Sequence, residues 1–448
     1  MTPHFTTHER ENMIKKVLHT AGNRVNEQDE MLDLIIEGVR PYGAGDPVAV
    51  AIDRGVIRSI GPDARRLTAA ERVDGNGGII FPSFVEPHIH LDKVLTRQFP
   101  GANVESWEEA EASQDRVKRT FTPESVESRA SRAIELAITN GVGLMRAHVA
   151  IDTAQELISL EGVLRARERW ADAIEIEIVA LIEESIVEHL ELLARAREAI
   201  RRGADVIGGI PNVEQDTPGQ LRHLAALFDI AEEFDTQVDA HVDYDADPSQ
   251  KALELLADVT LQRGFEGRVL ASHCCALAAY PQDESERVIE KVRRARITVC
   301  ISPLANLQQV GLIGRLPVHR GSSRTKELID AGVNVAAGTD NMNDTWFAFG
   351  RLDPIETAYV AILSAALRTE AEVAAGLEMV TDRAARALRR SARAIEVGAP
   401  ADLVVLEAGE LTDVLRGLSS RRVTIKDGKL VGGMATERWA RPLAVPSA

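Results

Sequence analysis

The middle of the chain alternates short apolar runs with longer amphipathic stretches, and this alternation constrains the fold more than any other feature. Stretches such as residues 123–140, 188–202 and 218–234 carry apolar residues at the i, i+3 and i+4 spacing of a helix. We expect about eight strand–helix units, which is the number that closes a (β/α)8 TIM-like barrel. The alternative is a doubly wound open sheet. The expected strands begin with the run at Phe84 and continue at 143–149, 174–181, 206–210, 237–242, 268–273, 297–301 and 333–338.

The two ends of the chain have a different pattern, with short β-type runs on both sides of the middle. Turn signals stand at Asp53-Arg54-Gly55 near the start and at Asp427-Gly428 near the end. We therefore expect a small β-sandwich domain built from both termini. The expected divisions are a polar N-terminal extension at 1–30, a composite β-sandwich domain at 31–82 and 391–448, and a barrel at 83–390.

Composition narrows the class of protein. The formal net charge of -17 argues against nucleic acid and against an anionic membrane surface as partners. Three cysteines cannot form a disulfide framework, which favours a reducing compartment. The polar N-terminus has no signal-peptide pattern, and no apolar run is long enough to span a bilayer. We expect a cytoplasmic enzyme or small-molecule binder.

Candidate metal ligands stand where the expected strands end. His88 and His90 are two residues apart, so on a strand both imidazoles point to the same side. Later strands end at His241 and His273, and Asp340 follows the last one. A lone histidine in such a place is more often a hydrogen-bonded core residue, but these five occur in order around one expected barrel face. A nitrogen-rich site with one carboxylate suits zinc or ferrous iron, which makes hydroxide available near neutral pH.

These segments resemble the amidohydrolase superfamily, and within it the cytosine deaminase-like branch, from about Leu32 to Val431. The motifs that carry the resemblance are Val85-Glu-Pro-His-Ile-His-Leu-Asp92, Arg146-Ala-His-Val, Gly203-Ala-Asp-Val-Ile-Gly-Gly-Ile-Pro211, Ala271-Ser-His273 and Gly338-Thr-Asp-Asn-Met-Asn-Asp-Thr-Trp346. The resemblance implies one divalent metal ion per chain, zinc or iron, held by His88, His90, His241 and Asp340. It also implies that His273 orients or activates the attacking water, that Asp340 takes part in proton transfers, and that the protein is a homo-oligomer.

Three polar positions depart from the pattern of that branch. Tyr244 stands three residues after His241, where deaminases of the branch place a glutamate that shuttles protons. On the third strand Glu183 replaces a glutamine that reads an amide face, and an ionised carboxylate prefers hydrogen-bond donors. Asn341 replaces the second aspartate after the eighth strand. Because a site built for one hydrogen-bond pattern rejects another, cytosine is not the expected substrate.

The leading hypothesis is a metal-dependent hydrolase that deaminates a small nitrogen heterocycle other than cytosine. Glu183, Asp243 or Asp245 could then relay the proton in place of the missing glutamate. Alternatively, Tyr244 could polarise a carbonyl, which suits hydrolysis of a cyclic amide, carbamate or urea. A non-catalytic ligand-binding barrel is a further alternative, although a binder needs no water-activating group beside a metal.

Two further residues are candidates for contact with the substrate. Lys93 closely follows the His-x-His motif and could meet a carbonyl or carboxylate of the substrate, or be a solvated loop lysine. Trp346 could wall the pocket or pack in the core. His148 lies inside an expected strand and is interpreted as a barrel-core histidine rather than as support for the metal ligands.

Overall fold

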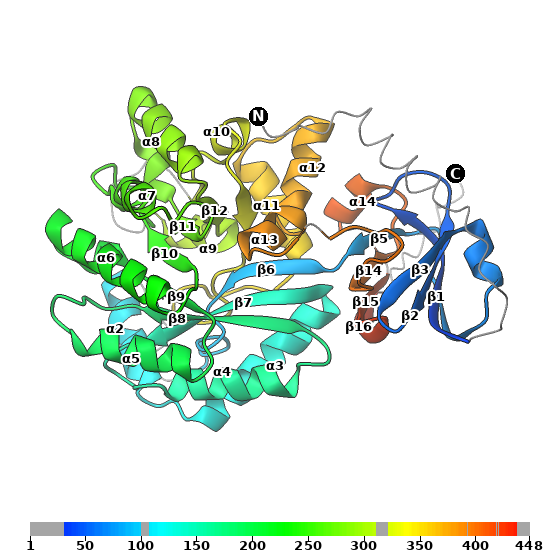
Figure 1. The fold of residues 1–448 in the computed structure, drawn as a ribbon, viewed down its shortest axis with the longest axis horizontal. Coiled ribbons are helices and arrows are strands. Elements are labelled where there is room, and N and C mark those ends of the chain that lie inside the picture. Colours follow the sequence, from blue (N-terminus) through cyan, green and yellow to red (C-terminus); the bar gives the residue numbers. More distant parts are fainter. Residues whose placement is uncertain are drawn as a thin grey trace, which may run out of the picture. The chain divides into compact units, whose positions relative to one another are not determined.

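The computed structural model describes residues 31–99, 107–310, 321–391, 393–417, 419 and 421–436, so the expected extension at 1–30 lies outside the described residues. The chain divides into two compact units (Figure 1). One contains Phe84–Ile138 and Val142–Arg393, and the other contains residues 31–83, 139–141 and 394–436. Across the described part of the chain, no helix combines the length and the apolar character needed to cross a membrane.

The larger unit is built on an eight-stranded parallel sheet in sequential order. Its two ends meet where Ile89 forms a parallel bridge with Asp340, which confirms the predicted TIM-like barrel. The expected strands coincide with the observed ones to within about two residues. They are β6 (Phe84–Ile89), β7 (Val142–Ile151), β8 (Glu175–Ile182), β9 (Val206–Gly209), β10 (Val238–Val242), β11 (Val269–His273), β12 (Thr298–Ile301) and β13 (Val335–Ala337).

Helices lie outside the strands of this unit (Figure 1). Their inner faces are apolar, as on α3, which buries Val126, Ala130 and Ile134 at helical spacing. The described helices are α2 (Trp107–Lys118), α3 (Pro123–Thr139), α4 (Ile158–Arg169), α5 (Glu191–Arg201), α6 (Thr217–Glu233), α7 (Ala252–Arg263), α8 (Gln282–Arg294), α9 (Pro303–Gln309), α10 (Thr325–Asp330), α11 (Pro354–Ser364), α12 (Glu370–Glu378) and α13 (Asp382–Ala387).

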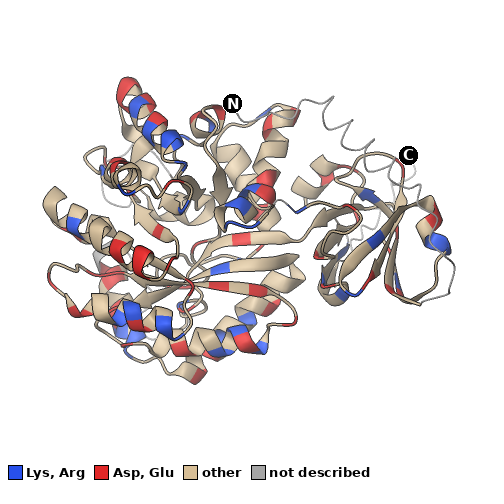
Figure 2. Ribbon diagram, viewed as in Figure 1, with Lys and Arg blue, Asp and Glu red and all other residues tan. Residues whose placement is uncertain are grey.

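Most of these helices carry residues of both charge signs, interspersed rather than segregated (Figure 2). Between α7 and α8, for example, Lys291 bonds both Glu254 at 2.7 Å and Asp258 at 2.9 Å. Such partly exposed pairs contribute little individually, because water screens them. The helices are therefore held to the barrel mainly by their buried apolar faces.

The smaller unit is a β-domain whose eight strands form one sheet, in which β1 joins both halves. Both predicted turns are present: Arg54 and Gly55 join β2 to β3, and Asp427 and Gly428 join β15 to β16, all four with positive φ. The strands are β1 (Leu32–Pro41), β2 (Val48–Asp53), β3 (Val56–Gly61), β4 (Ala69–Asp74), β5 (Ile79–Pro82), β14 (Leu403–Leu406), β15 (Arg421–Lys426) and β16 (Lys429–Ala435).

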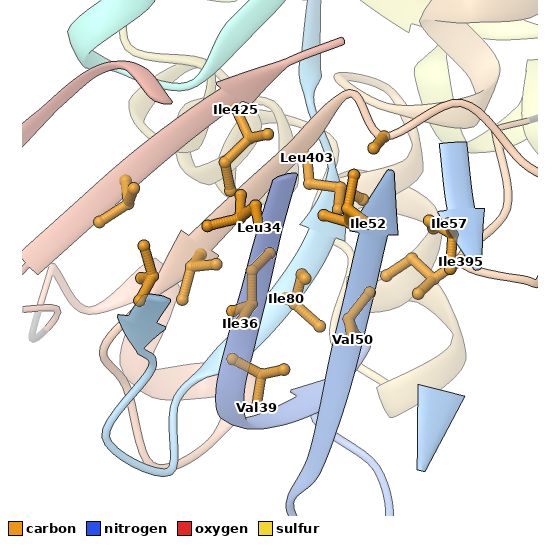
Figure 3. Close-up of a cluster of buried hydrophobic side chains, with 14 residues drawn as sticks. Leu34, Ile36, Val39, Val50, Ile52, Ile57, Ile80, Ile395, Leu403 and Ile425 are labelled. Atoms are coloured by element: carbon orange, nitrogen blue, oxygen red, sulfur yellow. The ribbon is translucent and has the colours of Figure 1, made fainter. Parts of the chain in front are cut away.

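A cluster of buried apolar side chains packs between strands of both halves of this β-domain (Figure 3). Val50 and Ile52 enter it from one half of the sheet, and Leu403 and Ile425 enter it from the other half. Because both halves bury side chains in the same core, the sheet must fold over on itself, as the predicted sandwich requires.

Candidate metal centre

Four of the predicted ligands converge at the carboxyl ends of the barrel strands. His88 lies on β6 and His90 follows it, His241 lies on β10, and Asp340 follows β13. All four side chains are buried. One nitrogen or oxygen atom of each lies within 4.8 Å of the others, which makes the group able to hold a metal ion. The structure thus brings together the four residues that the family resemblance implied as ligands.

The donor atoms lie close enough to share a single ion. Oδ1 of Asp340 is 3.3 Å from Nε2 of His88 and 3.2 Å from Nε2 of His90. Nε2 of His90 is 3.1 Å from Nε2 of His241. Nε2 of His88 is buried and has no hydrogen-bond partner among the described residues. Three imidazoles and one carboxylate that meet in this way fit a divalent transition metal.

The barrel closure fixes the position of Asp340. Its backbone N–H donates to the carbonyl of His88 at 2.7 Å, and its own carbonyl accepts from the N–H of His90 at 2.8 Å. Glu86, two residues before His88, accepts from the backbone N–H groups of His88 and Thr339, both at 3.0 Å. Sequence reasoning missed this role of Glu86, although its place on the same strand face as the histidines was a signal.

Burial sets the protonation of the three histidines, and neighbouring histidines set that of Asp340. It lowers the pKa of His88 to about 3, that of His90 to about 4, and that of His241 well below the usual value. Burial alone would raise the pKa of Asp340, but His273, His88 and His90 together hold it well below its usual range. The imidazoles are therefore neutral and the carboxylate is ionised at neutral pH, which are the forms that bind metal.

The metal-free protein is expected to lose stability as the pH falls from about 6.5 to 4.5. The unfolded chain protonates histidine near pH 6.5, whereas folded His88 and His90 stay neutral until about pH 3 and 4. At these two sites the unfolded state thus binds more protons in this window, and each histidine contributes a slope of up to about 1.4 kcal/mol per pH unit. Glu86 offsets part of this slope, because burial raises its pKa to about 7 and the folded state then binds its proton more readily. Urea unfolding in the presence of a chelator measures the slope.

Substitution of the more exposed His189 by Gln is the control for that slope. It should leave the pH dependence unchanged, while His88→Gln should make the profile shallower. A profile of His88→Gln as steep as that of the original protein would contradict the burial of a neutral His88.

His273 lies beside the four-residue group. Its ring centroid is 5.0 Å from that of His241 and 5.5 Å from that of His88. Asn306 on α9 holds the ring at Nδ1, which lies 3.1 Å from the amide Nδ2 and 3.5 Å from the amide Oδ1. The ring is therefore oriented by a partner that sequence reasoning missed, since Asn306 has no motif around it.

Glu183 lies between two lysines. Lys93 bonds one carboxylate oxygen of Glu183, and the ammonium of Lys118, from α2, lies 3.3 Å from the other. Burial alone would raise the pKa of Glu183, but Lys93 and Lys118 lower this pKa to about 2. An ionised carboxylate with both oxygens engaged is poorly suited to relay protons. Lys93 also lies 3.2 Å from Nδ1 of His90, so it is buried beside the metal ligands.

The remaining candidates from the sequence have structural partners of their own. Asn341 accepts from Gln309 at 3.1 Å and donates to Asp344 at 2.8 Å. Half-buried Trp346 donates its backbone N–H to the same Asp344. Asp344 therefore organises the loop that carries both residues.

Of the three candidates that follow His241, Asp243 and Tyr244 have different surroundings. Asp243, one of the alternative proton relays, accepts from Asn212 and from two backbone N–H groups of α7. Burial raises the pKa of Tyr244 to about 12, so its phenol stays neutral and can donate a hydrogen bond.

Comparison with known proteins gives consistent matches. The model of the amidohydrolase family matches residues 109–431. A pterin deaminase of Rhizobium rhizogenes is 30% identical over 392 residues, 85% of this chain and 87% of that protein. An N-isopropylammelide isopropyl amidohydrolase of a Pseudomonas species is 26% identical over 374 residues, 81% and 88% of the two chains. The crystal structure of 5-methylcytosine deaminase from Klebsiella pneumoniae with 5-fluorocytosine superposes with a TM-score of 0.84 at 28% identity, covering 91% and 99%.

Proposed function

The chain belongs to the amidohydrolase family and is a metal-dependent hydrolase of non-peptide C–N bonds, and on that premise we propose that it deaminates a small nitrogen heterocycle other than cytosine. The observation that carries the proposal is the convergence of His88, His90, His241 and Asp340, with His273 beside them at the same barrel face. A group that holds a metal next to a neutral imidazole is suited to activate water for attack on a ring carbon.

We infer that this group holds one divalent ion, zinc or iron. Such an ion supplies Lewis-acid activation of water near neutral pH. His273 then accepts the proton of the attacking water at Nε2, which is free when Nδ1–H donates to the amide oxygen of Asn306, 3.5 Å away. Asp340 contributes its negative charge among the imidazoles and takes part in the proton transfers. Lys93 and Trp346 remain candidates for contact with the substrate.

The choice against cytosine rests on Tyr244, Glu183 and Asn341, the three departures from the cytosine deaminase pattern. The relatives support a varied substrate range, since their names specify a pterin, an N-alkylated ammelide and 5-methylcytosine. The contacts of Lys93 and Lys118 with Glu183 also argue against cytosine as the substrate. They engage both oxygens of the carboxylate that replaces the amide-reading glutamine.

A second candidate function is the hydrolysis of a cyclic amide, carbamate or urea. It is favoured by Tyr244, whose neutral phenol can donate to a carbonyl oxygen but cannot act as a base at neutral pH. Because Lys93 and Lys118 engage both oxygens of Glu183, this residue is poorly suited to relay the proton that deamination requires.

Ammonia release with parallel ultraviolet monitoring tests both candidates over a panel of pyrimidines, triazines, pterins and cyclic ureides. We expect ammonia from at least one substrate other than cytosine with the metal-loaded protein, and none after removal of the metal by a chelator. A spectral change without ammonia would support hydrolysis of a cyclic amide, carbamate or urea instead. Preference for cytosine over every other compound would refute the proposal.

Location, assembly and partners of the protein are also proposed. We propose a cytoplasmic homo-oligomer that acts on small molecules and binds neither nucleic acid nor membranes, since the net charge of -17 opposes both surfaces. We also propose that residues 31–82 and 391–448 act as one composite domain and that residues 83–390 act as the barrel.

A further inference from the structure

We propose that His148 is a positioning residue of the metal centre: Arg146 and Asp239 fix its ring, and its ring holds the ligand histidines in place. The proposal rests on the metal centre proposed above and assigns to it a residue that lies outside the ligand set. His148 points into the barrel from β7, where sequence reasoning gave it the role of an ordinary core histidine.

The ring of His148 lies against all three histidines of the ligand group. Its centroid is 3.9 Å from that of His88, with the ring planes tilted by 32°. The corresponding distances are 5.3 Å to His241 and 5.6 Å to His90. Since the side chain is fully buried, any rotation of His148 must displace these neighbours.

A buried carboxylate lies next to the ring of His148 and restricts its position by charge and packing. Nε2 of His148 is 3.2 Å from Oδ1 of Asp239, and both side chains are fully buried. Asp239 lies on β10 two residues before His241, so the carboxylate and the ligand share one strand face. The strand that positions a ligand thus also positions the partner of His148.

Asp239 is itself fixed by a buried arginine. Nη1 of Arg146 donates to Oδ2 of Asp239 at 3.0 Å. The same guanidinium donates to Glu177 at 2.7 Å and to Gln237 at 2.5 Å. Three strands are tied in this way, because Arg146 belongs to β7, Glu177 to β8 and Asp239 to β10. The guanidinium of Arg146 therefore cannot rotate without breaking several charge-assisted hydrogen bonds.

The far side of His88 is also engaged. Its Nδ1 lies 2.9 Å from the hydroxyl of Ser272 on β11. His88 is therefore held at its edge by Ser272 and on its face by His148, which leaves Nε2 directed toward Asp340 at 3.3 Å. Partners that orient ligands in this way commonly contribute 10- to 100-fold to metal affinity.

A different role for His148 must be separated from this one. Atoms of His88, His148 and Asp239 also lie within 4.8 Å of one another, which is close enough for a metal ion. His88 is common to both groups, and its Nε2 faces Asp340. A second ion would therefore compete for a ligand of the first, which favours positioning over ligation.

Cobalt titration of the full chain tests the proposal without reference to any substrate. We expect His148→Ala to raise the dissociation constant for Co²⁺ by about 10- to 100-fold and to shift the visible absorption of the bound ion. His148→Phe, which keeps a ring but loses the polar contact with Asp239, should fall between His148→Ala and the original protein. Asp239→Asn should shift the spectrum in the same direction as His148→Phe.

The matched control is His223 on α6, another fully buried histidine paired with a carboxylate, at 3.0 Å from Glu214. His223→Ala should lower the thermal midpoint as His148→Ala does, but leave cobalt affinity and spectrum unchanged. Equal cobalt binding by both alanine variants would overturn the positioning role. Two ions in the original protein and one in His148→Ala would also overturn it, because His148 would then be a ligand. A chain that takes up no cobalt at all would refute the metal centre itself.

Discussion

Asp340→Asn is expected to lower turnover by about 10³-fold or more and to remove most of the bound metal. Asp340 is the carboxylate of the ligand group, and its charge lies 3.2 to 3.3 Å from two imidazole nitrogens. Asparagine tolerates the positive φ of 70° at this position, so the change removes charge with little backbone strain. Metal content by elemental analysis and turnover of the best panel substrate measure the two effects.

Asp344 offers a matched control for that substitution. It is a second buried carboxyl in the same loop, and it accepts from Asn341 and from the backbone N–H groups of Trp346 and Phe347. Asp344→Asn should destabilise the loop yet leave the metal bound, because Asp344 is not one of the four ligands. If both asparagine variants lost metal equally, loop geometry rather than the charge of Asp340 would hold the ion.

Sequence reasoning reached the barrel and the convergence of the ligand group because both follow from regular rules. Parallel strands end at one face of a barrel, so residues at strand ends meet there whatever their separation along the chain. His88 and Asp340 are a clear case, since β6 and β13 become neighbours only when the barrel closes. No comparable rule connects a helix end to a strand end. For this reason Lys118, which contacts Glu183 from α2, could not be predicted.

Side-chain partners inside the barrel were missed for a related reason. Asp239 and His148 meet only because the strands between them have one particular register, with Arg146 paired to Glu177 across β7 and β8. Periodicity shows that such residues face inward, but not which inward-facing residues touch. Asn306 likewise carries no pattern of its own, although it orients His273.

His273→Asn is expected to lower turnover by about 10² to 10⁴-fold while the metal stays bound. His273 lies beside the ligand group but is not one of the four converging residues, so its loss should remove proton transfer without removing a ligand. Asparagine is the replacement of choice because His273 has a φ of 72°, which alanine would adopt only with strain. Turnover and metal content of the purified variant are measured together.

Asn306→Ala tests whether the orientation of the His273 ring affects turnover. Asn306 contacts the ring of His273 at Nδ1, so its loss should free the ring and reduce turnover by about tenfold, again with metal retained. A graded series, in which Asp340→Asn loses metal and activity while His273→Asn and Asn306→Ala lose only activity, would separate ion binding from proton transfer. Full turnover by His273→Asn would place the proton acceptor elsewhere.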